Sequence, residues 1–145
     1  PLGTNPFSQD LSQQISVKTS IESVKYHSPA LDGTVVFRFD NNNGNYALGN
    51  GEYRFDTHWS RSGNDSIHAY GQIGFDSNLT EFPDIEQLQT LDYSSSVRTI
   101  HTGQIVVFEN EHCHFAAIKL GHVKSSNHGH SQDEMIFEYH IYSVI

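Results

Sequence analysis

Two stretches of alternating residue character constrain the fold of this chain more than any other feature. In residues 52–60, one alternating set is mostly aromatic: Tyr53, Phe55, Thr57 and Trp59. In residues 134–142, the corresponding set is apolar and aromatic: Met135, Phe137, Tyr139 and Ile141. Because successive side chains on a strand point to opposite faces, each stretch predicts a half-buried β-strand. We expect both sets to face one shared core, with Trp59 and Phe137 inside it.

Further short runs predict a fold built almost wholly from strands. Runs rich in β-branched and aromatic residues are found at 34–39, 66–70, 104–108 and 114–120, and two short strands are expected within 11–26. The Asn- and Gly-rich segment 40–44 predicts a turn with left-handed backbone angles. Pro83 and Asp84 can start one or two turns of helix over 84–91. Eight to ten strands and at most one short helix predict an all-β fold, either an antiparallel β-sandwich or a jelly-roll-like barrel.

The hairpin formed by residues 52–60 and 66–70 predicts a polar face. If Ser60 lies opposite Ser66, then Trp59 lies opposite Ile67 and His58 opposite His68, while Asp56 meets Tyr70. The side chains of His58, His68 and Tyr70 then form a solvated outer face, a polar ligand-binding face or a pH-sensitive patch.

Two residues outside that hairpin are further candidates for binding a ligand. Tyr93, like Tyr139 and Tyr142, combines apolar area with a hydroxyl group and is expected to reach a surface. Arg98 follows the polar segment 92–96, where its guanidinium can grip a carboxylate or phosphate. The alternative for Arg98 is an ion pair with a nearby acid that pins the loop.

Length and the first residues bear on how the chain is organised. A chain of 145 residues fits one domain, so we expect a single β domain over 11–145 preceded by a tail over 1–10. Pro1, Leu2 and Gly3 are typical of what a protease leaves of an expression tag. We therefore expect a domain that was cut from a longer protein.

Charge and cysteine content disfavour several partners. The formal net charge is −9 and the eight basic residues are scattered, so nucleic acid and anionic membranes are disfavoured as partners. The single cysteine, Cys113, excludes an intrachain disulfide, and no apolar stretch of 18 residues is present. A cytoplasmic protein fits these features best.

Ten histidines are the most unusual feature of the composition. A tight turn is expected over 110–112, followed by a strand from His114. If His112 and His114 were both on a strand they would share a face, and His128 and His130 lie on the next loop. Imidazoles that converge in this way could bind zinc, nickel or copper, and the alternative is a set of solvent-exposed histidines. No spacing in the sequence assigns a catalytic residue, and Cys113 is expected to be a buried or half-buried inert thiol.

Several segments together resemble a known but uncharacterised family. They are 49–60, 66–70, 92–99, 103–108, 116–120 and 133–139, which span most of residues 33–142. These segments resemble a β-rich C-terminal domain of bacterial effector proteins, such as those that carry a TIR domain. The resemblance implies a sensing or targeting domain fused to an effector domain, and it assigns no catalytic residues. The family has Asn-Gly at a hairpin where this chain has His112-Cys113.

Three functions follow from these features. The leading hypothesis is a non-enzymatic recognition or sensor module that binds a protein, small molecule or glycan through loops and an exposed sheet face. The first alternative is an acidic partner of the immunity-protein or inhibitor type, whose charge complements a basic protein. The second alternative is a metal-dependent enzyme that uses the His-rich tip.

Overall fold

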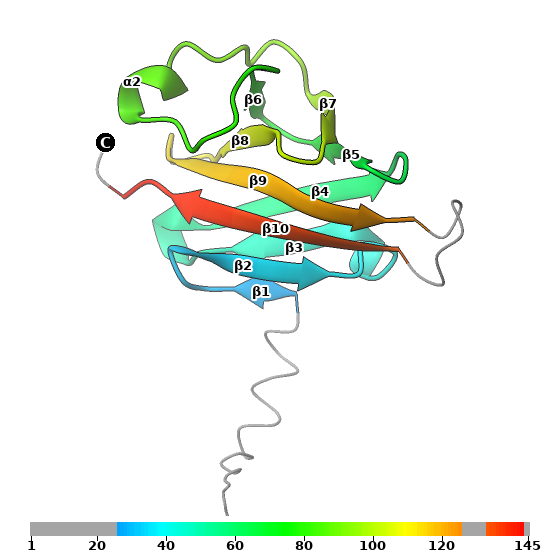
Figure 1. Cartoon of the computed structure of the whole chain (residues 1–145). Helices are drawn as coiled ribbons and strands as arrows, with labels where there is room; N and C mark the ends of the chain where they lie inside the picture. Colours follow the sequence, from blue (N-terminus) through cyan, green and yellow to red (C-terminus); the bar gives the residue numbers. More distant parts are fainter. Residues whose placement is uncertain (1–25, 126–132, 144–145) are drawn as a thin grey trace, which may run out of the picture.

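The computed structural model describes residues 26–125 and 133–143, which form two five-stranded sheets packed face to face (Figure 1). The first sheet has the order β1-β3-β4-β5-β7, with bounds His27–Ser28, Asn45–Leu48, Phe55–Arg61, Ser66–Tyr70 and Val97–His101. The second has the order β2-β10-β9-β8-β6, with bounds Asp32–Phe37, Glu134–Ile141, Phe115–Lys124, Ile105–Glu109 and Ile73–Phe75. Only the β1–β3 pair is parallel among these strands. The predicted all-β sandwich is confirmed.

The core between the sheets includes most of the alternating residues that the sequence singles out. Tyr53 is the exception, because it lies in the short helix η2 (Gly51–Tyr53) before β4 and is only half-buried against the core. Trp59 of β4 is 2% exposed and Phe137 of β10 is 0% exposed, and their ring centroids lie 5.8 Å apart. Thr57, also buried, satisfies its hydroxyl group by donating to the carbonyl of Tyr46 and accepting from the indole N–H of Trp59. A polar residue can lie in this core because both of its hydrogen-bonding functions have partners.

The β4–β5 hairpin has a different register from the predicted one. His58 lies opposite Tyr70 and Ser60 opposite His68, a shift of two residues from the expected pairing. The predicted hairpin leaves five residues, 61–65, between its strands. The observed connection is shorter because β4 continues to Arg61, whose guanidinium contacts the carboxylate of Asp133 at 2.6 Å. A shift by two residues keeps every side chain on its predicted face, so the predicted polar face survives.

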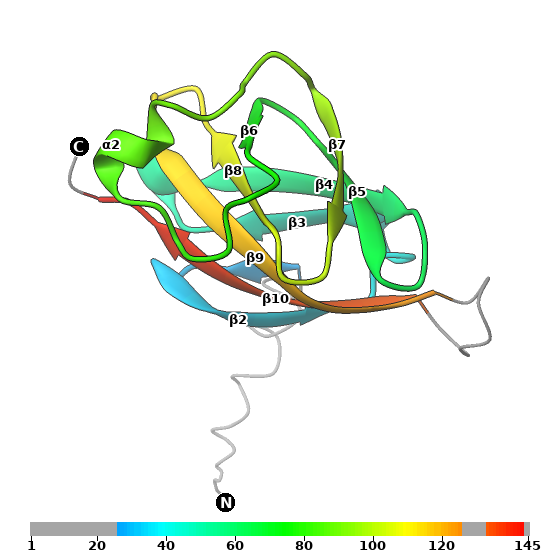
Figure 2. The ribbon, with the colours of Figure 1, turned by 45° about the horizontal axis from the view of Figure 1, so that its top comes forward.

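A second apolar cluster lies on the outer face of the second sheet. Figure 2 shows α2 (Ile85–Leu88) and its flanking chain over the ends of β8 and β9. Its buried members are Leu88, Leu91, Ile105, Val107, Ala117 and Tyr142. The helix starts as predicted, since Asp84 and Gln87 form a reciprocal capping box. This connection between β6 and β7 therefore gives one sheet apolar residues on both faces.

Tyr139 and Tyr142 do not reach the surface as expected, whereas the core-facing position that alternation predicts for Tyr139 is confirmed. Tyr139 is 2% exposed, and its hydroxyl group donates to the carbonyl of Ala30. Tyr142 is 8% exposed, and its hydroxyl group donates to the carbonyl of Pro83 beneath the α2 connection. Burial raises the pKa of both hydroxyl groups, that of Tyr142 to about 12. The two rings are buried because the second sheet is covered on both faces at this end.

Several turns also shape the framework. The predicted left-handed turn is confirmed, with positive φ at Asn42, Asn43 and Gly44 in the short helix η1 (Asn42–Gly44). Strand β9 is longer than expected because a bulge opposite Ile136 and Phe137 lets the chain continue past Gly121. The strands predicted within 11–26 fall outside the described residues, apart from Tyr26.

Candidate functional site

The outer face of the first sheet gathers the polar residues that the hairpin predicts. We call this surface the Tyr70 face, defined by outward side chains of β3, β4, β5 and β7: Asn45, His58, Ser60, His68, Tyr70 and Thr99. All six are exposed or half-buried. The register places His58 between Asn45 and Tyr70, and His68 between Ser60 and Thr99.

Each aromatic ring on the Tyr70 face is held by a neighbour. The Tyr70 ring lies 5.1 Å from the ring of His58 and 6.5 Å from that of His68, measured between centroids. The hydroxyl groups of Tyr70 and Ser60 lie 2.7 Å apart. These contacts fix the three rings before any ligand arrives, which lowers the entropic cost of binding.

Hydrogen bonds also determine how the two histidines present their nitrogen atoms. His58 Nδ1 lies 2.7 Å from Asn45 Oδ1, which can only accept, so Nδ1 carries the proton. In the neutral ring Nε2 of His58 is then a hydrogen-bond acceptor. His68 Nδ1 lies 2.9 Å from Thr99 Oγ1. The Tyr70 face thus offers imidazole, hydroxyl and amide groups around one aromatic ring.

The geometry of this face is poorly suited to nucleophilic catalysis. Thr99 and His68 are close enough for a hydroxyl–base pair, but both lie on an open sheet surface. Strand β5 is paired on both sides, with β4 and with β7, so its backbone N–H groups are used in the sheet. An oxyanion would find no backbone donors there. The arrangement is better suited to contact than to chemistry.

The structure places Arg98 and Tyr93 apart from the Tyr70 face. Arg98 forms the ion pair with a nearby acid that was the alternative to ligand binding. Its guanidinium lies 2.9 Å from the Asp92 carboxylate and 5.4 Å from the Phe75 ring centroid. Hydrogen bonds from Ser94, followed by the one from Arg98, lower the pKa of Asp92 to about 2. Tyr93 donates its hydroxyl hydrogen to the carbonyl of Leu88, and burial raises its pKa to about 12. Both residues serve the connection between β6 and β7.

A cleft of about 280 Å³ lies between the two sheets at the β8–β9 turn. Its charged and polar lining includes Arg54, Asp56, Gln72, Glu109, Glu111 and His112. Arg54 and Asp56 form an exposed ion pair at 3.1 Å. The remaining charged groups are carboxylates, so the mouth of the cleft is acidic.

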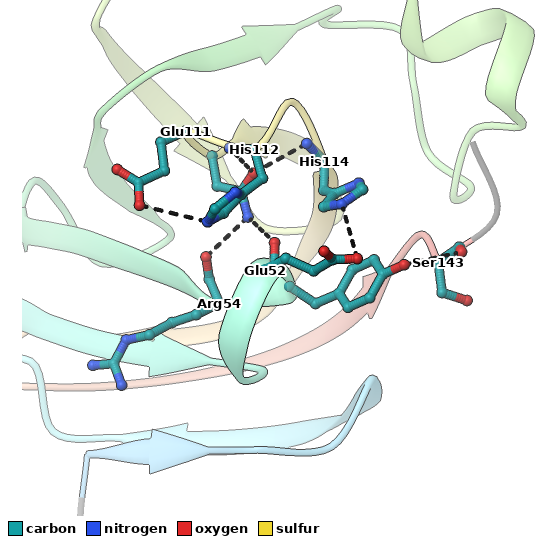
Figure 3. A network of polar contacts seen from close by, with 8 residues as sticks. Glu52, Arg54, Glu111, His112, His114 and Ser143 are labelled. Carbon is teal, nitrogen blue, oxygen red and sulfur yellow. Dashed lines mark hydrogen bonds and ion pairs between the residues drawn. The ribbon is translucent and has the colours of Figure 1, made fainter.

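Asn110 builds one wall of this cleft, and the sequence did not single it out. Its amide nitrogen donates to the carbonyls of Glu52 and Arg54 at 2.8 and 3.1 Å (Figure 3). Its amide oxygen accepts from the backbone N–H groups of His112 and His114 at 2.9 and 3.0 Å. The available signal was an Asn at the start of a turn, where such side chains often bond to the backbone.

The predicted turn over 110–112 is confirmed, but the following strand starts one residue later than expected, at Phe115, so His112 and His114 do not share a strand face. Both residues belong to the β8–β9 turn, in which Cys113 has a φ of 63° and is exposed rather than buried. His112 Nε2 lies 3.5 Å from a carboxylate oxygen of Glu111, and His114 stacks on Tyr53 with centroids 4.5 Å apart (Figure 3). The sequence pattern could not reveal the extra turn residue, because the side chain of Asn110 accepts from the backbone N–H groups of both His112 and His114 and so keeps His114 in the turn.

The predicted metal site is incomplete in the part of the chain that can be described. His128 and His130 lie outside the described residues. Within 26–125 and 133–143, no three His, Cys, Asp or Glu residues are grouped so that they could hold a metal ion. Strand β9 has ten residues, which corresponds to roughly 30 Å, and it separates His114 from Ser125.

Comparisons with known proteins give no relative for this sandwich. No family model, no curated protein and no solved structure matches the chain. Among the described residues, no helix has the length and apolar character needed to cross a membrane. The class of protein is therefore set by its architecture alone: a β-sandwich with one uncovered polar sheet face.

Proposed function

We propose that this chain is a non-catalytic recognition domain that binds its ligand on the Tyr70 face. The observation that carries the proposal is the half-buried Tyr70 ring, held between His58 and His68 on a rigid sheet. Aromatic rings with nearby polar groups bind ligands well because they combine apolar area with hydrogen bonding at little entropic cost. The resemblance to effector C-terminal domains supports the same role, with the chain as the sensing part of a longer bacterial protein.

A glycan is the ligand class that best fits this face. The groups around the Tyr70 ring are hydroxyl, amide and imidazole groups, rather than carboxylate or ammonium groups. Sugars present apolar C–H faces that stack on a ring and hydroxyl groups that donate and accept hydrogen bonds. A strongly charged ligand would lack a partner of opposite charge among these six side chains.

Binding to a glycan array, followed by isothermal titration calorimetry with the best oligosaccharide, tests this proposal. We expect Tyr70→Ala to weaken binding about tenfold or more, as is typical of a central aromatic contact. Glu138→Ala, an exposed change on strand β10 of the other sheet, is the matched control and should bind like the parent chain. Affinity that survives Tyr70→Ala, or a chain that binds no glycan, contradicts the proposal.

The acidic cleft favours one second candidate, a partner for a basic protein. Asp56 is 74% and Glu111 87% exposed at the side chain, and both line the cleft beside Asn110. With a net charge of −9, such a surface would steer a cationic partner and lose association rate as salt rises. A lysine- or arginine-rich probe peptide tests this candidate. Binding should weaken with salt and with Glu111→Gln, whereas Tyr70→Ala should leave it unchanged.

A further inference from the structure

Strand β2 is an open edge of the second sheet. Among the described strands it pairs with β10 alone, in antiparallel register. Natural sheets usually protect such edges by short strands, prolines, bulges or charged side chains in the middle of the strand. The six residues of β2 contain no proline, and their register with β10 is regular.

The backbone groups of alternate β2 residues point away from the sheet. Ile141 N–H donates to Leu31 C=O at 2.8 Å, which makes this an internally hydrogen-bonded pair of the antiparallel ladder. Such pairs alternate along the strand with pairs whose N–H and C=O groups point outward. Asp32, Thr34 and Val36 belong to the outward set, and none of them has a further backbone partner within residues 26–125 or 133–143.

Apolar surface gathers at the same edge. Of the large hydrophobic residues that are exposed in the described chain, Val36 is the most exposed, at 61%, and Leu31 at this edge and Val97 on β7 follow at 44%. Beside Val36 and Arg38 lies a hollow of about 170 Å³, which the rings of Tyr26 and Tyr46 also line. Exposed apolar residues next to unpaired strand groups are typical of an interaction surface.

The charges at the two ends of β2 identify the partner. Asp32 begins the strand and Arg38 directly follows it, and both side chains are exposed. When two copies of β2 pair antiparallel about a two-fold axis at Val35, Asp32 of each copy lies opposite Arg38 of the other. In the same register Thr34 lies opposite Val36, so residues of the outward set lie opposite one another and can exchange backbone hydrogen bonds. A two-fold interface requires this kind of self-complementarity.

We propose that β2 is a homodimer interface, in which two copies of the chain join their second sheets edge to edge. The new pairs satisfy the outward backbone groups, cover one side of Val36 with Thr34 of the other copy and form two Asp32–Arg38 ion pairs. Pairing also brings Leu31 of each copy toward the hollow beside Arg38 of the other. The Tyr70 face lies on the first sheet and stays exposed, so this inference does not depend on the proposed function.

The other described edges fit this role less well. Strand β1 has two residues and β6 has three, and β6 is bridged to Asp92 through Phe75. Strand β7 is longer, but its charged or titratable side chains are Arg98 and His101, without an acid to oppose them. Self-pairing of β7 would therefore lack the reciprocal ion pairs that β2 offers.

Sedimentation equilibrium of the full chain at about 0.15 M salt, up to about 1 mM protein, tests the proposal. We expect a reversible monomer–dimer equilibrium that Val36→Lys abolishes, because it places a cation at the centre of both paired edges. Val97→Lys, the same change at an exposed site on the β7 edge, is the matched control and should leave the equilibrium unchanged.

Charge reversal tests the register. Asp32→Arg alone and Arg38→Asp alone should each raise the dimer dissociation constant about tenfold or more, because each places like charges opposite each other at both ends. The double variant Asp32→Arg/Arg38→Asp restores opposite charges and should recover the parent dissociation constant. Both substituted positions are on the surface, and circular dichroism checks that the three variants keep the fold. A chain that stays monomeric, a dimer that tolerates Val36→Lys, or a double variant that does not recover overturns the proposal.

Discussion

Asn110 shows how one side chain can join the two sheets. Its amide bonds four backbone groups, two in the segment before β4 and two in the β8–β9 turn. The β8–β9 turn then positions His112 at the mouth of the acidic cleft and His114 against the ring of Tyr53. The cleft thus depends on a residue that carries no charge and performs no chemistry.

Replacing Asn110 should destabilise the fold. Asn110→Ala leaves four backbone groups without their partner, and we expect the free energy of unfolding to fall by about 1–3 kcal/mol. Asn110→Asp keeps the two contacts in which the side chain accepts but loses both in which it donates. Near neutral pH its free energy of unfolding should therefore lie between those of the parent chain and Asn110→Ala. Urea denaturation followed by Trp59 fluorescence measures both. Equal free energies of unfolding for the parent chain, Asn110→Ala and Asn110→Asp would contradict a stabilising role of the Asn110 side chain.

Asp92 should make stability depend on pH in the acid range. Its pKa is about 2 in the folded chain against 3.8 as an ordinary value, so the folded state favours the carboxylate. The resulting stabilisation is present above about pH 4 and is lost as pH falls through 2, because protonation removes the bonds from Ser94 and Arg98.

An NMR titration of the Asp92 carboxyl carbon measures this pKa directly. In Asp92→Asn, the loss of stability between pH 4 and pH 2 should be shallower than in the parent chain. Asp76→Asn, which removes an exposed carboxyl group from the same connection, serves as the control. A midpoint for Asp92 near 3.8 would refute the prediction.

At the scale of elements, the η1 turn that leads into β3 lies directly against the backbone of β4. Gly44, in the η1 turn before β3, has a φ of 77°, and a Cβ atom there would lie 2.0 Å from the carbonyl oxygen of Trp59. Backbone thus packs directly against backbone where the turn crosses β4. Gly103, in the β7–β8 turn, also has a positive φ, of 91°, but open space surrounds it.

The two glycines separate steric overlap from backbone strain. Gly44→Ala should lower the free energy of unfolding by about 3 kcal/mol or more, because the turn must move away from β4. Gly103→Ala carries only the cost of a left-handed alanine, about 1 kcal/mol. Thermal denaturation ranks the two variants. Similar losses for both would show that the close approach of Gly44 to Trp59 contributes little.

At the scale of the molecule, one ion pair links the two sheets near the β4–β5 turn. Arg61 ends β4 of the first sheet, and Asp133, which directly precedes β10 of the second, has a side chain only 3% exposed. The Arg61 pKa is raised, first by its hydrogen bond to Asp133. A buried carboxylate that loses its cation is far more costly than an exposed one.

Arg61→Met should therefore destabilise the chain more than Arg54→Met. Arg54 forms an ion pair of the same kind with Asp56, but both partners are well exposed and the pair contributes at most about 1 kcal/mol. Adding Asp133→Asn to Arg61→Met should return part of the lost stability, since no uncompensated carboxylate remains. Urea midpoints of the three variants measure this order, and equal losses from Arg61→Met and Arg54→Met would argue against the link.

The β-sandwich and its two faces followed from residues near one another in the chain. Alternation alone predicted that Trp59, Phe137 and their neighbours face the core, because the strand period of two is a local property of the backbone. The same alternation placed His58, His68 and Tyr70 on one outward face, although it missed their register by two residues. Local pattern specifies a face, but several registers satisfy it equally well.

Tertiary structure decided what depends on distant residues. The ion pair between Arg61 and Asp133 joins positions 72 residues apart, and Arg61 belongs to a β4 that is longer than the sequence predicts. The α2 connection covers Tyr142 and buries it. Asn110 bends the chain at His112 and His114 through carbonyls more than 50 residues away. Periodicity carries no information about such pairings, because the free energy that selects them comes from contacts that exist only once the two sheets have packed.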